Sequence, residues 1–206
     1  MKKTLSKKYL LPQIAAASAI NKFNLLREII LKAKSEKVSF SKIYETILQN
    51  YLFVGYPSAL SSLKILKEYY PNKKLPSVTD MNLYHFRQKG KERCRKVYGN
   101  KFEKLIRNIN NFSPELAEWL VLEGYGKVLG RTGLSFKDRE LCIVAVLSAL
   151  KFEAQLYSHI NGAIKAGGSI KDVQNVIENL DLLGKKNLSG IGIKVLNRYR
   201  KEKGML

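Results

Sequence analysis

One glutamate and one histidine in the C-terminal half of the chain are spaced for joint acid/base chemistry. Glu140 lies near the start of a predicted helix, and His159 lies seven residues into the next one. If the two helices form an antiparallel hairpin that turns near Lys151 and Phe152, a rise of about 1.5 Å per residue places the side chains about one turn apart. A carboxylate beside an imidazole fixes the tautomer of the ring, so the pair can donate or accept a proton near neutral pH.

Two further side chains share the helix face of His159. Gln155 precedes it by four residues and Phe152 by seven, spacings that repeat on one side of a helix. The face therefore combines a titrating group, an amide and an aromatic wall. Spacing alone fits a second interpretation equally well, in which His159 is a core histidine that is hydrogen-bonded to a structural Glu140.

A glycine-rich segment leads into the Glu140 helix and carries two more candidates. Tyr125 lies between Gly124 and Gly126, and Arg131 follows Gly130. A tyrosine hydroxyl and an arginine beside a His/Glu pair can hold an anionic carbonyl or carboxylate substrate. Alternatively, Tyr125 is a packing aromatic and Arg131 a surface residue.

The elements that must position these residues are predicted to be helices throughout. Apolar residues recur at helical spacing along the whole chain, and alternating β-branched runs are few. The prediction is therefore an all-α fold. The expected helices cover residues 8–21, 23–36, 40–53, 57–69, 82–97, 101–109, 114–129, 136–151, 153–167, 170–183 and 187–202.

The order of the chain suggests an internal repeat. Residues 13–47 align without a gap on residues 143–177, at a constant offset of 130, with identities such as Ala15/Ala145 and Ser18/Ser148. The two copies share a packing scheme but not a site, because Leu10, Leu25 and Ile29 stand where the second copy has Glu140, Gln155 and His159. Pro71 and Pro76 bound the clearest linker between the two copies. We expect a first repeat without site residues over 1–70, a linker over 71–80 and a second repeat with the site over 81–206.

Composition narrows the class of protein. The chain has 206 residues, of which 45% are hydrophobic, enough for a sizeable core. Its two cysteines form no CxxC pair, and it has only two histidines; we therefore expect no disulfide framework, no metal site and a cytoplasmic location. No stretch approaches the ~20 apolar residues of a membrane span.

The formal net charge of +20 raises the possibility of a nucleic-acid partner. The lysines and arginines are scattered, however, and none lies in a motif of a known nucleic-acid reader. A solvated basic surface that helps to gather small anions is the preferred interpretation, and a nucleic-acid-binding protein is the less favoured one.

With these residues in view, the chain resembles a known family. The run from Gly130 through Glu140 to Leu141, continuing through Ala145–Leu150, Gln155, His159 and Gly167, is similar to the carboxymuconolactone decarboxylase family. The similarity covers residues 114–185, and residues 54–60 resemble the helix-turn-helix that closes the family's repeat. The resemblance implies an alkylhydroperoxidase-D-like helical fold and assembly as a homo-oligomer, a trimer or a hexamer-like arrangement.

The resemblance also implies site residues. The peroxidase branch of the family uses a glutamate, a CxxC pair and a histidine, and these positions fall on Glu140, Phe152, Gln155 and His159. Without a thiolate there is no nucleophile for peroxide, so CxxC-dependent peroxidase activity should be absent. The decarboxylase branch acts on a lactone dicarboxylate without a cofactor; here His159 would supply the proton, and Arg131 or Arg139 would hold a carboxylate.

These considerations predict a cofactor-independent lyase or isomerase that acts on a small anionic carbonyl or lactone compound, with His159 and Glu140 as the catalytic pair. The alternative is a non-catalytic helical oligomer of the same fold that has lost the redox cysteines.

Overall fold

The computed structural model describes residues 6–75, 82–184 and 187–205, and every regular element in these ranges is helical. The all-α fold class is thereby confirmed. The described chain forms two compact units. The first comprises Met1–Lys73 together with Gly133–Leu206, and the second comprises Lys74–Thr132.

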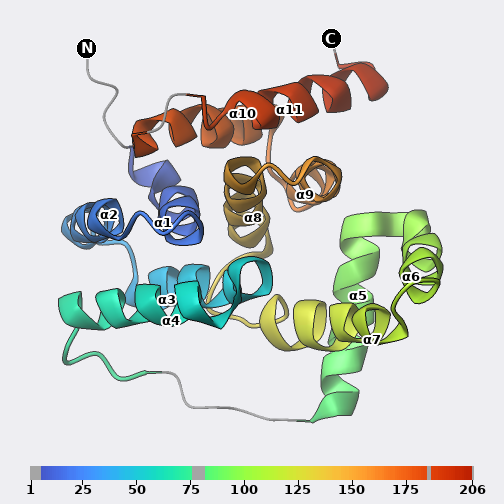
Figure 1. The fold of residues 1–206 in the computed structure, drawn as a ribbon, viewed down its shortest axis with the longest axis horizontal. Coiled ribbons are helices and arrows are strands. Elements are labelled where there is room, and N and C mark those ends of the chain that lie inside the picture. Colours follow the sequence, from blue (N-terminus) through green and yellow to red (C-terminus); the bar gives the residue numbers. More distant parts are fainter. Residues whose placement is uncertain (1–5, 76–81, 185–186, 206) are drawn as a thin grey trace. The chain divides into compact units, whose positions relative to one another are not determined.

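The first unit is built around two central helices, α1 (Leu10–Ala19) and α8 (Phe136–Leu150), which lie side by side in Figure 1. Both are almost wholly buried and rich in alanine and small aliphatic residues, which lets the two backbones approach closely. The surrounding elements are η1 (Lys7–Tyr9), α2 (Phe23–Ser35), α3 (Phe40–Gln49), α4 (Tyr51–Tyr69), α9 (Glu153–Lys165), α10 (Ile170–Glu178), the 3₁₀ helix Asn179–Leu183 and α11 (Gly190–Glu202).

Helix boundaries in this unit recur at the offset of 130 residues. Helices α2 and α9 correspond at both ends, and α3 and α10 correspond at their first residue. The left-handed turns correspond as well, because Asn21 and Lys37 have positive φ angles, as do Lys151 and Gly167. In Figure 1 the pair α3–α4 and the pair α10–α11 lie on opposite sides of α1 and α8. A common origin of the two halves stays a prediction.

The compact units group the chain in another way than the predicted repeats, whose boundaries stay a prediction. The prediction treats 1–70 and 81–206 as separate repeats joined by 71–80, whereas α1 and α8 share one core within a single unit. The reason is that each central helix is apolar on nearly every side and must bury one face against the other. Residues 76–80 of the expected linker lie outside the described residues.

The expected helix over 40–53 is wrong at its end. Helix α3 ends at Gln49, and α4 runs from Tyr51 through a kink at Gly55, where φ is 71° and ψ is 179°. Pro57 lies just after the kink and lacks a backbone N–H, so the regular hydrogen-bond ladder is interrupted there. Ser39 also makes no side-chain cap, whereas its counterpart Ser169 forms a full capping box with Asp172.

The second unit consists of α5 (Leu83–Tyr98), η2 (Gly99–Lys101), α6 (Phe102–Asn110), α7 (Pro114–Trp119) and the π-helix Leu120–Val128. The single helix expected over 114–129 is therefore an α-helix that continues as a π-helix. Helix α5 packs on the π-helix through two glycines. A Cβ atom at Gly90 would lie 1.9 Å from the Val121 carbonyl oxygen, and one at Gly126 would lie 2.0 Å from that of Phe86.

None of the described helices is long and apolar enough to cross a membrane.

Candidate functional site

The turn between α8 and α9 brings Glu140 and His159 together. Helix α8 ends at Leu150, and Lys151 takes a left-handed conformation with φ 65°. The amide N–H groups of Lys151 and Phe152 then donate to carbonyls of the last turn of α8, at 3.2 and 3.0 Å, which closes the helix end. Helix α9 starts at Glu153 and runs back along α8.

The two side chains form a buried hydrogen bond. Nδ1 of His159 lies 2.8 Å from Oε2 of Glu140, with 5% of His159 and 1% of Glu140 exposed. An ionised carboxylate only accepts hydrogen bonds, so Nδ1 carries the hydrogen in this contact. In the neutral ring Nε2 then holds the lone pair, so Nε2 is the ring nitrogen that can accept a proton.

The other carboxylate oxygen, Oε1 of Glu140, is also buried, and no hydrogen-bond partner for it is found among the described residues. A buried carboxylate oxygen normally has a partner, such as an ordered water or a bound ligand. Oε1 of Glu140 is therefore a hydrogen-bond acceptor next to the His159 ring that a water or a donor group of a ligand would satisfy.

Phe53 is a neighbour of His159 that the sequence reasoning missed. Its ring centroid lies 6.4 Å from that of His159 at an interplanar angle of 83°, an edge-to-face arrangement. Phe53 belongs to the first turns of α4, just before the kink at Gly55. Nothing in the spacing of the second copy points to it, because it comes from the other half of the chain.

Arg139 is adjacent to Glu140 in α8 but is directed to α3. Its Nη2 lies 2.8 Å from Oε2 of Glu45, and its Nη1 donates to Oε1 of Gln49 at 3.1 Å. Arg139 is 1% exposed and Glu45 3%. Successive helical residues point about 100° apart, which explains why the two neighbours on α8 serve different contacts. The guanidinium is thus engaged in a buried ion pair, and its role as a substrate ligand stays a prediction.

The remaining predicted ligands lie in different surroundings. Phe152 and Gln155 are exposed at the start of α9, Phe152 by 49%. Tyr125 is buried in the second unit, where its hydroxyl donates to that of Tyr98 at 3.0 Å, and Arg131 belongs to the same unit. Their participation in a site with His159 stays a prediction.

Both cysteines are buried, free thiols. Burial raises the pKa of Cys94 to about 12, and burial likewise raises the pKa of Cys142 well above its usual range. Neither side chain is therefore a ready thiolate nucleophile.

Comparison with known proteins gives two matches. Residues 114–185 match the model of the carboxymuconolactone decarboxylase family. The protein is also similar to "Peroxisomal protein 2" of Schizosaccharomyces pombe, with 25% identity over 140 residues, which are 66% of this chain and 65% of the relative. The match thus spans less than two thirds of the relative's length. The segment 114–185, which contains both Glu140 and His159, is thus the part of the chain that resembles the carboxymuconolactone decarboxylase family.

Proposed function

We propose that the protein is a cofactor-independent lyase or isomerase that acts on a small anionic carbonyl or lactone compound. The buried 2.8 Å contact between His159 and Glu140 within the family segment carries this proposal. Glu140 orients the ring through Nδ1, and Nε2 of His159 exchanges protons with the substrate.

A decarboxylation illustrates the balance of the reaction. The bond between the carboxylate and the adjacent carbon breaks, CO2 leaves, and the electron pair passes into the neighbouring carbonyl as an enolate. The protonated ring of His159 then delivers its Nε2 proton to that carbon, and the neutral ring recovers a proton from solvent. Glu140 stabilises the charged ring during this cycle.

The substrate's negative charge needs a cation or hydrogen-bond donors. Arg131 and Tyr125 remain the proposed ligands for this charge, and Phe152 and Gln155, which are exposed at the start of α9, are proposed to contact the substrate. The net charge of +20 favours the approach of anions in general.

The test uses the variant His159→Asn. An asparagine amide can still donate to Glu140, as Nδ1 does, but has no group that titrates near neutral pH. We expect this variant to fold with a melting temperature close to that of wild type. Its turnover number on a panel of β-keto acids and unsaturated lactone carboxylates should fall by about 10²–10⁴-fold. Release of CO2 or the ultraviolet spectrum of the product reports the reaction.

A non-catalytic helical oligomer is the competing function, because a histidine 5% exposed and bonded to a glutamate also suits a structural core. The non-catalytic function would be favoured if wild-type protein converted no compound of the panel and was thermally stabilised by none of them. We also propose that the chain assembles into a homo-oligomer and resides in the cytoplasm. Analytical ultracentrifugation tests the assembly.

Fractionation of the source cells tests the location. The test is needed because the name of the fungal relative, "Peroxisomal protein 2", indicates peroxisomes and not the cytoplasm for that relative.

A further inference from the structure

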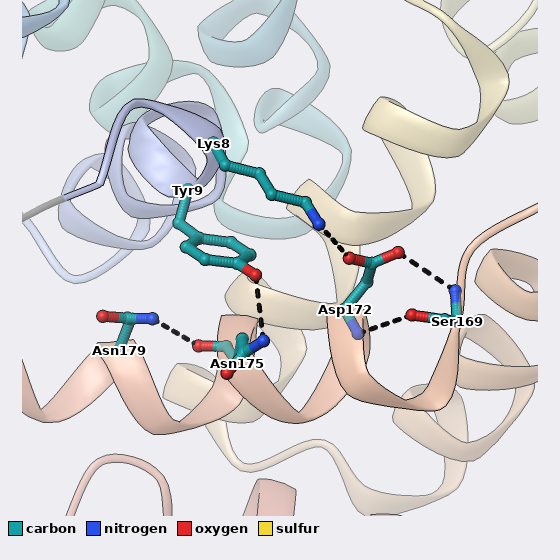
Figure 2. Close-up of polar contacts among 6 residues, drawn as sticks. All are labelled: Lys8, Tyr9, Ser169, Asp172, Asn175 and Asn179. Carbon is teal, nitrogen blue, oxygen red and sulfur yellow. Dashed lines mark hydrogen bonds and ion pairs between the residues drawn. The ribbon is translucent and has the colours of Figure 1, made fainter.

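Polar contacts between the two halves of the first unit occur in matched pairs. Within the first unit, residues 7–69 lie in the predicted first repeat and residues 136–202 in the predicted second repeat, and the two names refer to these segments below. Nζ of Lys8 lies 2.5 Å from Oδ1 of Asp172, as Figure 2 shows. Shifting each residue by 130 to the opposite repeat gives Asp138 and Lys42, and these two also form an ion pair, with 3.6 Å between Oδ2 and Nζ.

A second pair of contacts obeys the same rule. Nδ2 of Asn175 donates to the hydroxyl of Tyr9 at 2.9 Å (Figure 2). The residues that correspond to Tyr9 and Asn175 at the offset of 130 are Arg139 and Glu45, which form the buried ion pair at 2.8 Å. In a twofold-symmetric dimer, every contact between residues i and j is accompanied by one between j and i. The two repeats therefore face each other like the halves of such a dimer.

The residue types, however, are not symmetric. At the first pair of contacts the first repeat supplies both lysines, Lys8 and Lys42, and the second repeat supplies both aspartates, Asp138 and Asp172. At the second pair, the first repeat supplies a hydroxyl and the buried acid, and the second repeat supplies the buried guanidinium and an amide.

This division of charge penalises the pairing of like repeats. Two first repeats would bring Lys8 against Lys42 twice and would leave Glu45 facing a tyrosine. Two second repeats would bring two pairs of aspartates together and leave Arg139 facing an asparagine. The two lysine–aspartate pairs, whose lysines are exposed, contribute little individually, but a buried charge without its partner is strongly unfavourable.

We propose that the surface between the repeats is a heterotypic docking surface that accepts the unlike repeat and rejects a like repeat from a second chain. Its specificity resides in the exchanged charges, because the four contacts occupy equivalent positions of the two repeats. A chain that folds among its own copies is thereby directed to pair its first repeat with a second repeat.

Two variants with equal net charge test the proposal. The symmetric variant K8D/D172K/E45N/R139Y gives both repeats identical residues at all four contacts. The exchange variant K8D/K42D/D138K/D172K reverses every exposed pair but keeps the two repeats different. Both lose the bond from the Ser169 amide N–H to the Asp172 carboxylate, so that loss cancels in the comparison.

Each protein is unfolded in denaturant and refolded at low and high chain concentration. Size-exclusion chromatography with light scattering then measures species larger than the native assembly that persist on dilution. Pairing of unlike repeats between two chains is open to all three proteins, so only an excess over wild type reports like-with-like pairing.

We expect the symmetric variant to form about tenfold more of these species than wild type, and the exchange variant to match wild type within about twofold. Equal amounts from the symmetric variant and wild type, or an equal rise in both variants, would overturn the proposal. If the symmetric variant shows no cooperative unfolding, K8D/D172K replaces it. This smaller variant equalises only the exposed contacts; a rise of about threefold supports the proposal and no rise overturns it.

Discussion

His159 and Glu140 are 2.8 Å apart in the second repeat, and the first repeat has Ile29 and Leu10 at the two corresponding positions, both fully buried. The chain thus contains an apolar version of its own candidate site. H159I alone leaves the Glu140 carboxylate buried without its donor and should lower the free energy of unfolding by about 1–3 kcal/mol. E140L/H159I removes both polar groups and should restore stability to about the wild-type value.

Urea unfolding of the two variants measures this difference, and both should lack turnover. If H159I were as stable as wild type, the Glu140 carboxylate would not depend on the ring for its hydrogen bond, and this outcome would contradict the structural alternative.

Glu140→Gln isolates the charge of the carboxylate from its position. The amide oxygen can still accept from Nδ1 of His159, so the fold should change little, but the protonated ring loses its counter-charge. We expect turnover to fall by about 10²–10⁴-fold while the ring keeps its tautomer. Nitrogen-15 chemical shifts of the imidazole report the tautomer. Unchanged turnover would reduce Glu140 to a structural role.

Removing one partner of the Arg139–Glu45 ion pair should lower the free energy of unfolding strongly, whereas replacing both partners with uncharged residues should lower it little. Arg139→Met leaves a buried carboxylate and should lower the free energy of unfolding by about 3–5 kcal/mol, whereas E45Q/R139M should recover most of this loss. Urea unfolding compares the two. If KM for an anionic substrate rises equally in both variants, Arg139 also binds substrate; if KM recovers in the double variant, the arginine acts through the fold.

The hairpin that positions the candidate pair could be predicted because it depends on local signals. Helical periodicity places Glu140 and His159, and the expected turn near Lys151 and Phe152 agrees with the left-handed residue found there. The buried contact follows from two helices of known rise joined by a short turn.

Contacts from other parts of the chain could not be predicted in this way. Phe53 reaches His159 only because of how α4 packs, and Arg139 turns toward Glu45, 94 residues earlier in the chain. Both contacts join helices that are distant in the sequence, α4 with α9 and α8 with α3, and no local pattern encodes which distant helices meet. The repeat offset was the one signal that could have revealed the matched contacts, because it links Lys8 to Asp138 and Tyr9 to Arg139.

The contact between α5 and the π-helix in the second unit should tolerate no side chain at Gly90 or Gly126. Gly126→Ala would bring a methyl group against the Phe86 carbonyl, and Gly90→Ala one against that of Val121. Each substitution should lower the free energy of unfolding by about 1–3 kcal/mol or more. Gly124→Ala is the matched control in the same π-helix, since its nearest neighbour would be 3.8 Å away. Thermal unfolding of the three variants would contradict this packing if Gly124→Ala were as damaging as the others.

Acid should remove the stabilisation that Asp172 provides. The hydrogen bond with the Lys8 ammonium is the main cause that lowers the pKa of Asp172 to about 2, and bonds from Ser169 add to it. A carboxyl whose folded pKa lies below its unfolded value stabilises the fold fully above about pH 4, and this contribution disappears as the pH falls toward 2. Because Lys8 is exposed and screened, we expect about 1–2 kcal/mol from Asp172 at pH 6.

Asp172→Asn should therefore be less stable than wild type at pH 6 by this amount and equally stable near pH 2. Urea unfolding at a series of pH values between 6 and 2 measures the difference. Lys8→Met removes the cation of the same ion pair. Like Asp172→Asn, it should reduce the change in the free energy of unfolding between pH 6 and pH 2. A difference between wild type and Asp172→Asn that persists undiminished at pH 2 would show that the capping bonds at Ser169, and not the charge on Asp172, hold this end of α10.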